Sequence, residues 1–130
     1  MINSKMNRYL SGFAPSEGKI WTDRVLDNPY LEMEAVYKPL VAYKLLYDLA
    51  ERDVDAGWKC FDYASDDTVE FLAAALEMNG DTQFAGKLRQ FKQSKPVNLK
   101  YVRDYVVANQ RYLQSKIQRY VVDHIDEFEL

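Results

Sequence analysis

The side chains with the most reactive chemistry in this 130-residue chain are its one histidine, His124, and its one cysteine, Cys60. An imidazole can act as a general base or bind a metal, and a thiolate becomes a nucleophile when a base lies beside it. A zinc site takes three or four ligands, usually several Cys or His, so one of each argues against zinc. We interpret His124 as a hydrogen-bonded structural residue and Cys60 as a small buried apolar residue. A catalytic Cys60–His124 pair is the alternative.

Paired carboxylates are the third group with chemical potential, and they occur at Asp53/Asp55, Asp66/Asp67 and Asp126/Glu127. A glycosidase uses such a pair as acid and base. Here the acids are so numerous that capping of helix starts explains them better. The glycines are isolated and form no phosphate-binding loop. We therefore expect no enzyme activity, no cofactor and no metal, and a small hydrolase is the alternative.

The charge of the chain is divided along the sequence, although the formal net charge is only −3. Residues 45–81 hold ten acids against two bases, or −8, and residues 82–120 hold nine bases against one acid, or +8. The last residues are acidic again. Such a dipolar chain steers charged partners by its field.

The acidic stretch predicts a negative patch that binds and blocks the basic surface of a partner protein, such as a toxin, an effector or a DNA-binding protein. Trp58 would be its aromatic anchor. The chain would then be an immunity protein, an inhibitor or a DNA mimic. The expected partner-binding residues are Asp53, Asp55, Trp58, Asp62, Asp66, Asp67 and Glu70.

The basic stretch predicts the alternative, a nucleic-acid-binding domain. Its bases are interleaved with Tyr101, Tyr105 and Tyr112, and such a mixture binds phosphates and stacks bases. Pairing of these bases with the acids of residues 45–81 is the other interpretation, and the overall pI of about 5.2 disfavours a dedicated nucleic-acid binder. The bases concerned are Lys87, Arg89, Lys92, Lys100 and Arg103.

The elements that position these side chains are predicted to be helices. A short amphipathic segment covers Lys19–Leu26. A helix within Tyr30–Val54 is expected to stop or kink near Lys38 and to restart with Pro39 in its first turn. A short aromatic segment follows at Trp58–Ala64.

The second half of the chain carries clearer helix signals. Asp67-Thr68-Val69-Glu70 has the form of a capping box, Asn79-Gly80 is a helix stop, and Asp81 can cap the next helix. Ser94-Lys95-Pro96 indicates a loop, and Asn98 can cap the last and longest helix. The apolar stripe of that helix has steps of three and four: Val102, Val106, Asn109, Leu113, Ile117, Tyr120/Val121, His124 and Phe128.

No segment shows a sustained period of two, so the sequence predicts an all-α fold. We expect a loose N-terminal arm at residues 1–18, with Met1 or Met6 as the start, and one compact domain at residues 19–130. The domain would be a bundle of five or six helices with a long C-terminal helix. The lone cysteine and the lack of a long apolar run or signal peptide predict a cytoplasmic protein that does not enter the membrane.

Residues Tyr47–Ser65 resemble the signature of a bacterial DNA-mimic-protein family. In that family an acidic residue and Val precede Asn-Gly-Gly-Phe, then Gln, two aromatic residues and Asn-Ser. The end of the chain, Tyr120–Phe128, is similar to the family's ending of an aromatic, an aliphatic, His and an acid before Phe. The sequence departs from the signature at four positions, where Asp55 replaces Asn, Ala56 replaces Gly, Cys60 replaces Gln and Ala64 replaces Asn.

The resemblance covers residues 38–128 and implies a helical scaffold without enzyme activity. The best-understood type in the family is an acidic helical protein that occupies the DNA-binding surface of a transcription factor, and relatives are suited to be immunity proteins against secreted toxins. Because most polar residues of the signature are replaced here, the resemblance implies that a ligand site built on them is lost.

Overall fold

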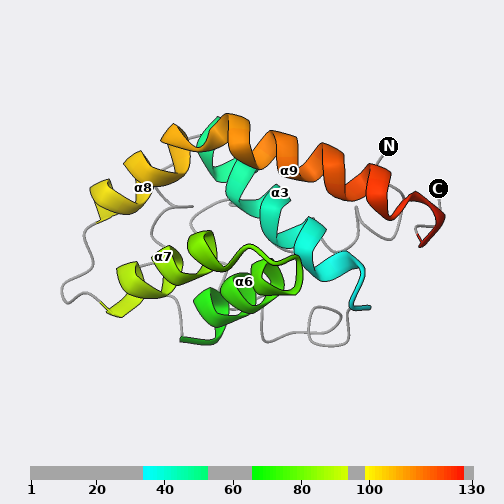
Figure 1. Ribbon diagram of the computed structural model, residues 1–130. Helices are drawn as coiled ribbons and strands as arrows, with labels where there is room; N and C mark the ends of the chain where they lie inside the picture. Colours follow the sequence, from blue (N-terminus) through cyan, green and yellow to red (C-terminus); the bar gives the residue numbers. More distant parts are fainter. Residues whose placement is uncertain (1–33, 53–65, 94–98, 128–130) are drawn as a thin grey trace.

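Helix α3 (Tyr37–Arg52) forms the centre of the fold, because nearly every face of it is covered by other helices. It packs against α6 (Asp66–Met78), α8 (Leu99–Ala108) and α9 (Gln110–Asp123). In Figure 1, α8 and α9 lie along one side of α3, and α6 and α7 lie along the other. The buried apolar residues of α3 are Tyr37, Leu40, Val41, Ala42, Tyr43, Leu45, Leu46, Leu49 and Ala50.

The computed structural model describes residues 34–52, 66–93 and 99–127. These ranges contain five α-helices and a short 3₁₀ helix, η1 (Ile125–Glu127), and they contain no strand. The predicted all-α fold is confirmed. The predicted N-terminal arm, the segments Lys19–Leu26 and Trp58–Ala64, the loop at residues 94–96 and the Asn98 cap lie outside the described residues.

The start of α3 agrees with the predicted restart of a helix around Pro39. Tyr37 is the first helical residue, so Pro39 lies in the first turn, where its missing N–H costs no intrahelical hydrogen bond. The preceding residues turn into the helix through a hydrogen bond from the Tyr37 N–H to the Glu34 carbonyl. The other end of the chain meets this turn, because the Tyr120 hydroxyl donates to the Val36 carbonyl at 2.6 Å.

Helices α6 and α7 (Thr82–Gln93) form a helical hairpin around the predicted Asn79-Gly80 stop, and its turn is closed by backbone hydrogen bonds. The N–H of Gly80 donates to the Glu77 carbonyl, and the N–H of Asp81 donates to the Leu76 carbonyl. This pair of bonds is the Schellman motif, which needs a left-handed residue before the last donor. Gly80 supplies it with a φ of 76°.

The predicted long C-terminal helix is present only in part, because it is divided into α8 and α9 at Asn109. The Asn109 side-chain amide donates to the Tyr105 carbonyl at 2.7 Å, so it competes with the backbone for that acceptor. The helical path still continues, since the N–H of Leu113 donates to the Asn109 carbonyl. The two helices follow one another along the same side of the molecule with a bend between them (Figure 1).

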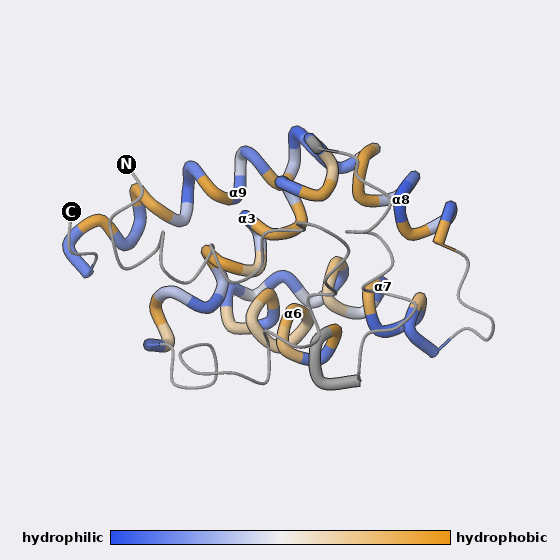
Figure 2. Tube along the Cα trace, turned by 180° about the vertical axis from the view of Figure 1, so that it is seen from behind, coloured by the Kyte–Doolittle hydropathy of each residue, from blue (hydrophilic) through white to orange (hydrophobic). Residues whose placement is uncertain are grey.

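The predicted apolar stripe of this region faces the core on both sides of the bend. Val102 and Val106 on α8, and Leu113, Tyr120 and Val121 on α9, are buried. Figure 2 shows hydrophobic and hydrophilic residues alternating along α9, as expected of a helix with one face inward.

Candidate functional site

The predicted acidic patch lies mostly outside the described residues. This applies to Asp53, Asp55, Trp58 and Asp62. Asp66 and Asp67 are the first two residues of α6, and the structure describes their backbone only. Glu70, one turn further along α6, is the member of the patch whose side chain is described, and it is exposed.

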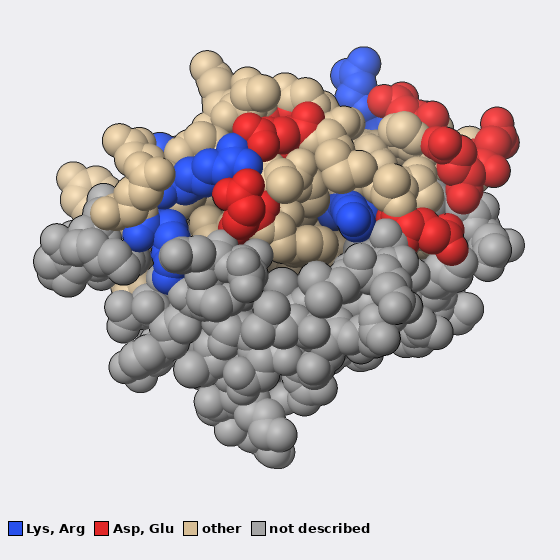
Figure 3. Space-filling model, turned by 90° about the horizontal axis from the view of Figure 1, so that it is seen from below, with Lys and Arg blue, Asp and Glu red and all other residues tan. Residues whose placement is uncertain are grey.

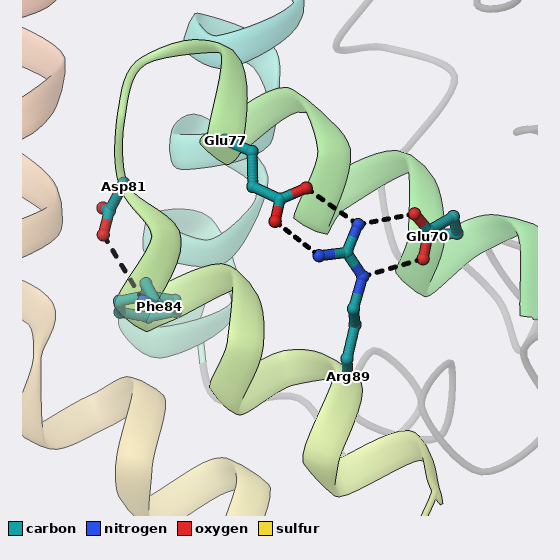
Figure 4. A network of polar contacts seen from close by, with 5 residues as sticks. All are labelled: Glu70, Glu77, Asp81, Phe84 and Arg89. Carbon is teal, nitrogen blue, oxygen red and sulfur yellow. Dashed lines mark hydrogen bonds and ion pairs between the residues drawn. The ribbon is translucent and has the colours of Figure 1, made fainter.

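Glu70 does not act as a free charge, because Arg89 of α7 binds it through two hydrogen bonds. Arg89 Nε donates to Glu70 Oε2 at 2.9 Å, and Arg89 Nη2 donates to Glu70 Oε1 at 2.5 Å. The same guanidinium also binds Glu77 of α6, at 2.6 Å through Nη1 and at 2.9 Å through Nη2. Figure 4 shows Arg89 between the two carboxylates, each held by two contacts. The guanidinium thus bridges two turns of the neighbouring helix.

This arrangement changes the ionisation of all three groups. Hydrogen bonds from Arg89 lower the pKa of Glu70 and of Glu77, and the two carboxylates raise the pKa of the guanidinium. All three therefore stay charged at neutral pH, with one positive charge against two negative charges. The predicted capping-box role of Glu70 is replaced by this ion pair, in which Glu70 and Glu77 share the charge of Arg89.

A second polar cluster surrounds Asp81, which is the buried charged residue among the described residues, with 7% of its surface exposed. Its Oδ1 accepts a hydrogen bond from the Phe84 N–H at 3.4 Å, so the predicted helix cap is confirmed. Its Oδ2 accepts from the Tyr43 hydroxyl at 2.9 Å and from the Tyr112 hydroxyl at 2.8 Å. The Asn79 side chain in turn donates to the Tyr43 hydroxyl at 3.3 Å.

The tyrosines around Asp81 are held in their neutral form. Burial raises the pKa of Tyr43 and of Tyr112, and the hydrogen bonds to Asp81 raise both further, while the bond from Asn79 opposes this at Tyr43. Every polar group of the cluster has a partner. We interpret it as a structural joint between α3, α7 and α9, since a buried carboxylate with three donors is satisfied where it lies.

His124 follows the last turn of α9 and is engaged on two sides. Its Nδ1 contacts the Glu127 carboxylate, and its ring lies 4.2 Å from the Tyr120 ring, measured between centroids. Burial and the charge of Glu127 raise the pKa of Tyr120 to about 12. These contacts support the structural interpretation of His124. Cys60, its predicted alternative partner, lies outside the described residues.

The basic residues of the nucleic-acid alternative are partly used within the fold. Arg89 is bound to its two glutamates, and the Lys87 ammonium lies over the rings of Phe91 and Tyr105, at 5.2 and 5.7 Å from their centroids. Lys100 is exposed, whereas Lys92 and Arg103 are half-buried.

The tyrosines of that alternative are also engaged in packing. Tyr105 packs against Phe84 and Phe91, and Tyr112 stacks on Phe84 with centroids 6.0 Å apart and planes 5° apart. Two of the three tyrosines that would stack on bases are therefore part of the α7–α8–α9 contact.

The acids near the C-terminus form a surface that the sequence-based predictions did not include among the partner-binding residues. At this end of the described chain, Val122 and Ile125 expose 68% and 41% of their surfaces. Three exposed carboxylates accompany them within the same six residues, and we call this group the C-terminal patch. Its members are Val122, Asp123, Ile125, Asp126 and Glu127. Figure 3 shows one group of acidic side chains toward one end of the face seen from below and another beside basic side chains nearer its middle.

No helix in residues 34–52, 66–93 and 99–127 is long and apolar enough to span a bilayer. Within the same ranges, no group of three or more His, Cys, Asp or Glu side chains is arranged to hold a metal ion.

Comparisons with protein-family models, with curated proteins and with solved structures give no match for this chain. The resemblance to the DNA-mimic-protein family therefore stays a prediction from the residues quoted above.

Proposed function

We propose that this chain works without catalysing a reaction, by binding and blocking a basic surface of another protein. The observation that carries the proposal is the C-terminal patch, where two exposed aliphatic side chains adjoin three exposed carboxylates. Protein interfaces combine an apolar centre with a polar rim in this way. An immunity protein, an inhibitor and a DNA mimic are the forms such a protein takes.

The charge of the patch supports a basic partner. Asp123 and Asp126 are exposed, and neither forms an ion pair with another described residue. Carboxylates of this kind steer an oppositely charged protein toward the surface and fix its orientation there. In the same proposal, Asp66 and Asp67 at the start of α6 and the acids of residues 53–62 add to the negative field. The single cysteine suits a reducing cytoplasm.

The test compares capture of host proteins by the wild-type chain and by three variants that each add two units of positive charge. D123N/D126N neutralises the patch, and D66N/D67N neutralises the acids at the start of α6. Q83K/Q93K adds the same charge at two exposed positions of α7. We expect one protein that the wild type and Q83K/Q93K retain and that D123N/D126N loses.

Stopped-flow mixing of each chain with that purified protein then measures the association rate and its dependence on salt. D123N/D126N should lower the association rate several-fold and flatten its dependence on salt, while the control variant changes neither by a comparable amount. Capture that is equal for all four chains would overturn the role of the acids. Capture of nucleic acid that is lost on nuclease treatment would favour the alternative, in which the basic residues bind nucleic acid.

A further inference from the structure

Helices α8 and α9 together form an arch, and its outer side presents a second exposed surface that the proposed function does not use. Asp104, Val107, Ala108 and Arg111 are all exposed there, on the side of the helices opposite the buried Val102, Val106 and Leu113. The helical register is continuous across the bend, because Asn109 donates to the Tyr105 carbonyl and accepts from the Leu113 N–H. These four exposed residues therefore form one stripe, which we call the arch stripe.

The arch stripe has opposite charges at its two ends. Asp104 precedes Val107 and Ala108, and Arg111 follows them, seven residues after Asp104. Seven residues are close to two helical turns, or about 10 Å along the axis. Asp104 and Arg111 are both exposed, and neither forms an ion pair with another described residue, so both charges face solvent.

The arch stripe of one copy is complementary in charge to the arch stripe of a second copy that runs in the opposite direction. In a two-fold contact, residue i of one copy meets residue j of the other, and j meets i. If two arches cross in antiparallel directions at Val107 and Ala108, Asp104 of each copy meets Arg111 of the other. The contact thus has an apolar centre and two opposite-charge pairs, related by the two-fold axis.

We propose that the arch stripe binds a second copy of this chain, so that the protein forms an antiparallel dimer through α8 and α9. The order of acid, two apolar residues and base is self-complementary in an antiparallel contact, so a second copy of this chain supplies the opposite charge at both ends of the stripe. The exposed Tyr101, at 68%, lies one turn before Asp104 and extends the contact. One helix pair buries little surface, so the dimer is expected to be weak and to form at raised protein concentration.

The test uses charge reversal and sedimentation equilibrium of the full chain. The variants D104R and R111D each place like charges opposite one another twice per dimer, so each should raise the dimer dissociation constant at least about tenfold. The double variant D104R/R111D restores both pairs with the signs exchanged and should dimerise like the wild type.

A mixture of the two single variants gives the most specific result. The D104R chain is basic at both ends of the stripe and the R111D chain is acidic at both, so they should form a heterodimer although neither forms a homodimer. The control variant D123R changes the net charge as much as D104R does, about three turns beyond Arg111, and should leave the dimer unchanged.

Two results would overturn the proposal. One is a wild-type chain that stays monomeric at millimolar concentration. The other is a dimer that persists in both D104R and R111D, which would place the contact elsewhere. Circular dichroism of each variant checks that it is folded. Formation of a heterodimer in the mixture is a second check, because unfolded chains would not form it. D123R also separates this contact from the proposed function, because it should weaken partner capture alone.

Discussion

The Tyr112 hydroxyl donates to the buried Asp81 carboxylate at 2.8 Å, and this bond joins α9 to the start of α7 across 31 residues of sequence. The same carboxylate accepts from Tyr43 of α3. Three elements that are distant in the chain therefore meet at one charged residue, which also caps a helix. A group with that many donors fixes the relative positions of the helices more specifically than apolar contacts alone.

Replacing Asp81 by alanine should destabilise the fold strongly. The variant loses the cap of α7 and leaves the buried Tyr43 hydroxyl without its acceptor, so we expect a loss of about 2 to 4 kcal/mol in the free energy of unfolding. Urea denaturation followed by circular dichroism measures it. Tyr112→Phe removes one donor of three and should cost about 1 kcal/mol. A D81A protein as stable as the Y112F protein would contradict the structural role of the cluster.

Gly80 and Gly86 should respond in opposite ways to replacement by alanine. Gly80 has a φ of 76° and open space around its Cβ position, so Gly80→Ala should destabilise the chain by about 1 to 2 kcal/mol through the backbone alone. Gly86 lies inside α7, and no atom lies within 4 Å of the position that an alanine Cβ would take, so Gly86→Ala should stabilise the chain by about 1 kcal/mol. Thermal unfolding of the two variants checks this, and shifts of the same sign would refute it.

The sequence predicted the local features of the fold well, because each depends on a few neighbouring residues. The Asn79-Gly80 stop, the Asp81 cap and the restart at Pro39 all follow from backbone chemistry that acts over one turn. The hydrogen bonds from Tyr43 and Tyr112 to Asp81 were missed, because the sequence around a capping residue does not indicate that it also has partners on distant helices. The break at Asn109 was missed because Asn109 fits the spacing of the apolar stripe.

The candidate site was harder to predict for a related reason. The sequence shows how many acids there are, but it does not show which of them a base will reach. Arg89 was counted among the nucleic-acid-binding residues and Glu70 among the partner-binding acids, yet they bind one another across the α6–α7 hairpin. The interpretation that bases pair with the acids of residues 45–81 is confirmed for this residue.

Raising the pH should weaken the fold above the ordinary tyrosine range. Burial raises the pKa of Tyr120 to about 12, and it also raises the pKa of Tyr43 and Tyr112. A group whose pKa is higher in the folded chain contributes stability that is complete below the unfolded pKa of about 10 and is lost as the pH rises toward the folded pKa. Unfolding free energies between about pH 9 and pH 12 should therefore fall, less so in Tyr120→Phe. An unchanged stability across this range would contradict the assignment.

Arg89→Gln should restore ordinary titration to both of its carboxylates. Because the hydrogen bonds from Arg89 lower the pKa of Glu70 and Glu77, their contribution to stability is present above the unfolded value of 4.5 and is lost as the pH falls. NMR titration of the side-chain carboxyl carbons should show both pKa values rising in the variant. Lys44→Gln, which removes the half-buried ion pair with Asp48, is the control and should leave the pKa values of Glu70 and Glu77 unchanged.

The order of the helices along the chain has a consequence for biosynthesis. Helix α3 leaves the ribosome before the other described helices, yet one of its main neighbours is α9, and Tyr120 must reach the Val36 carbonyl across 84 positions. During translation, the part of the apolar surface of α3 that packs on α9 stays uncovered until α9 emerges. That interval is when the chain is most exposed to aggregation and most in need of a chaperone.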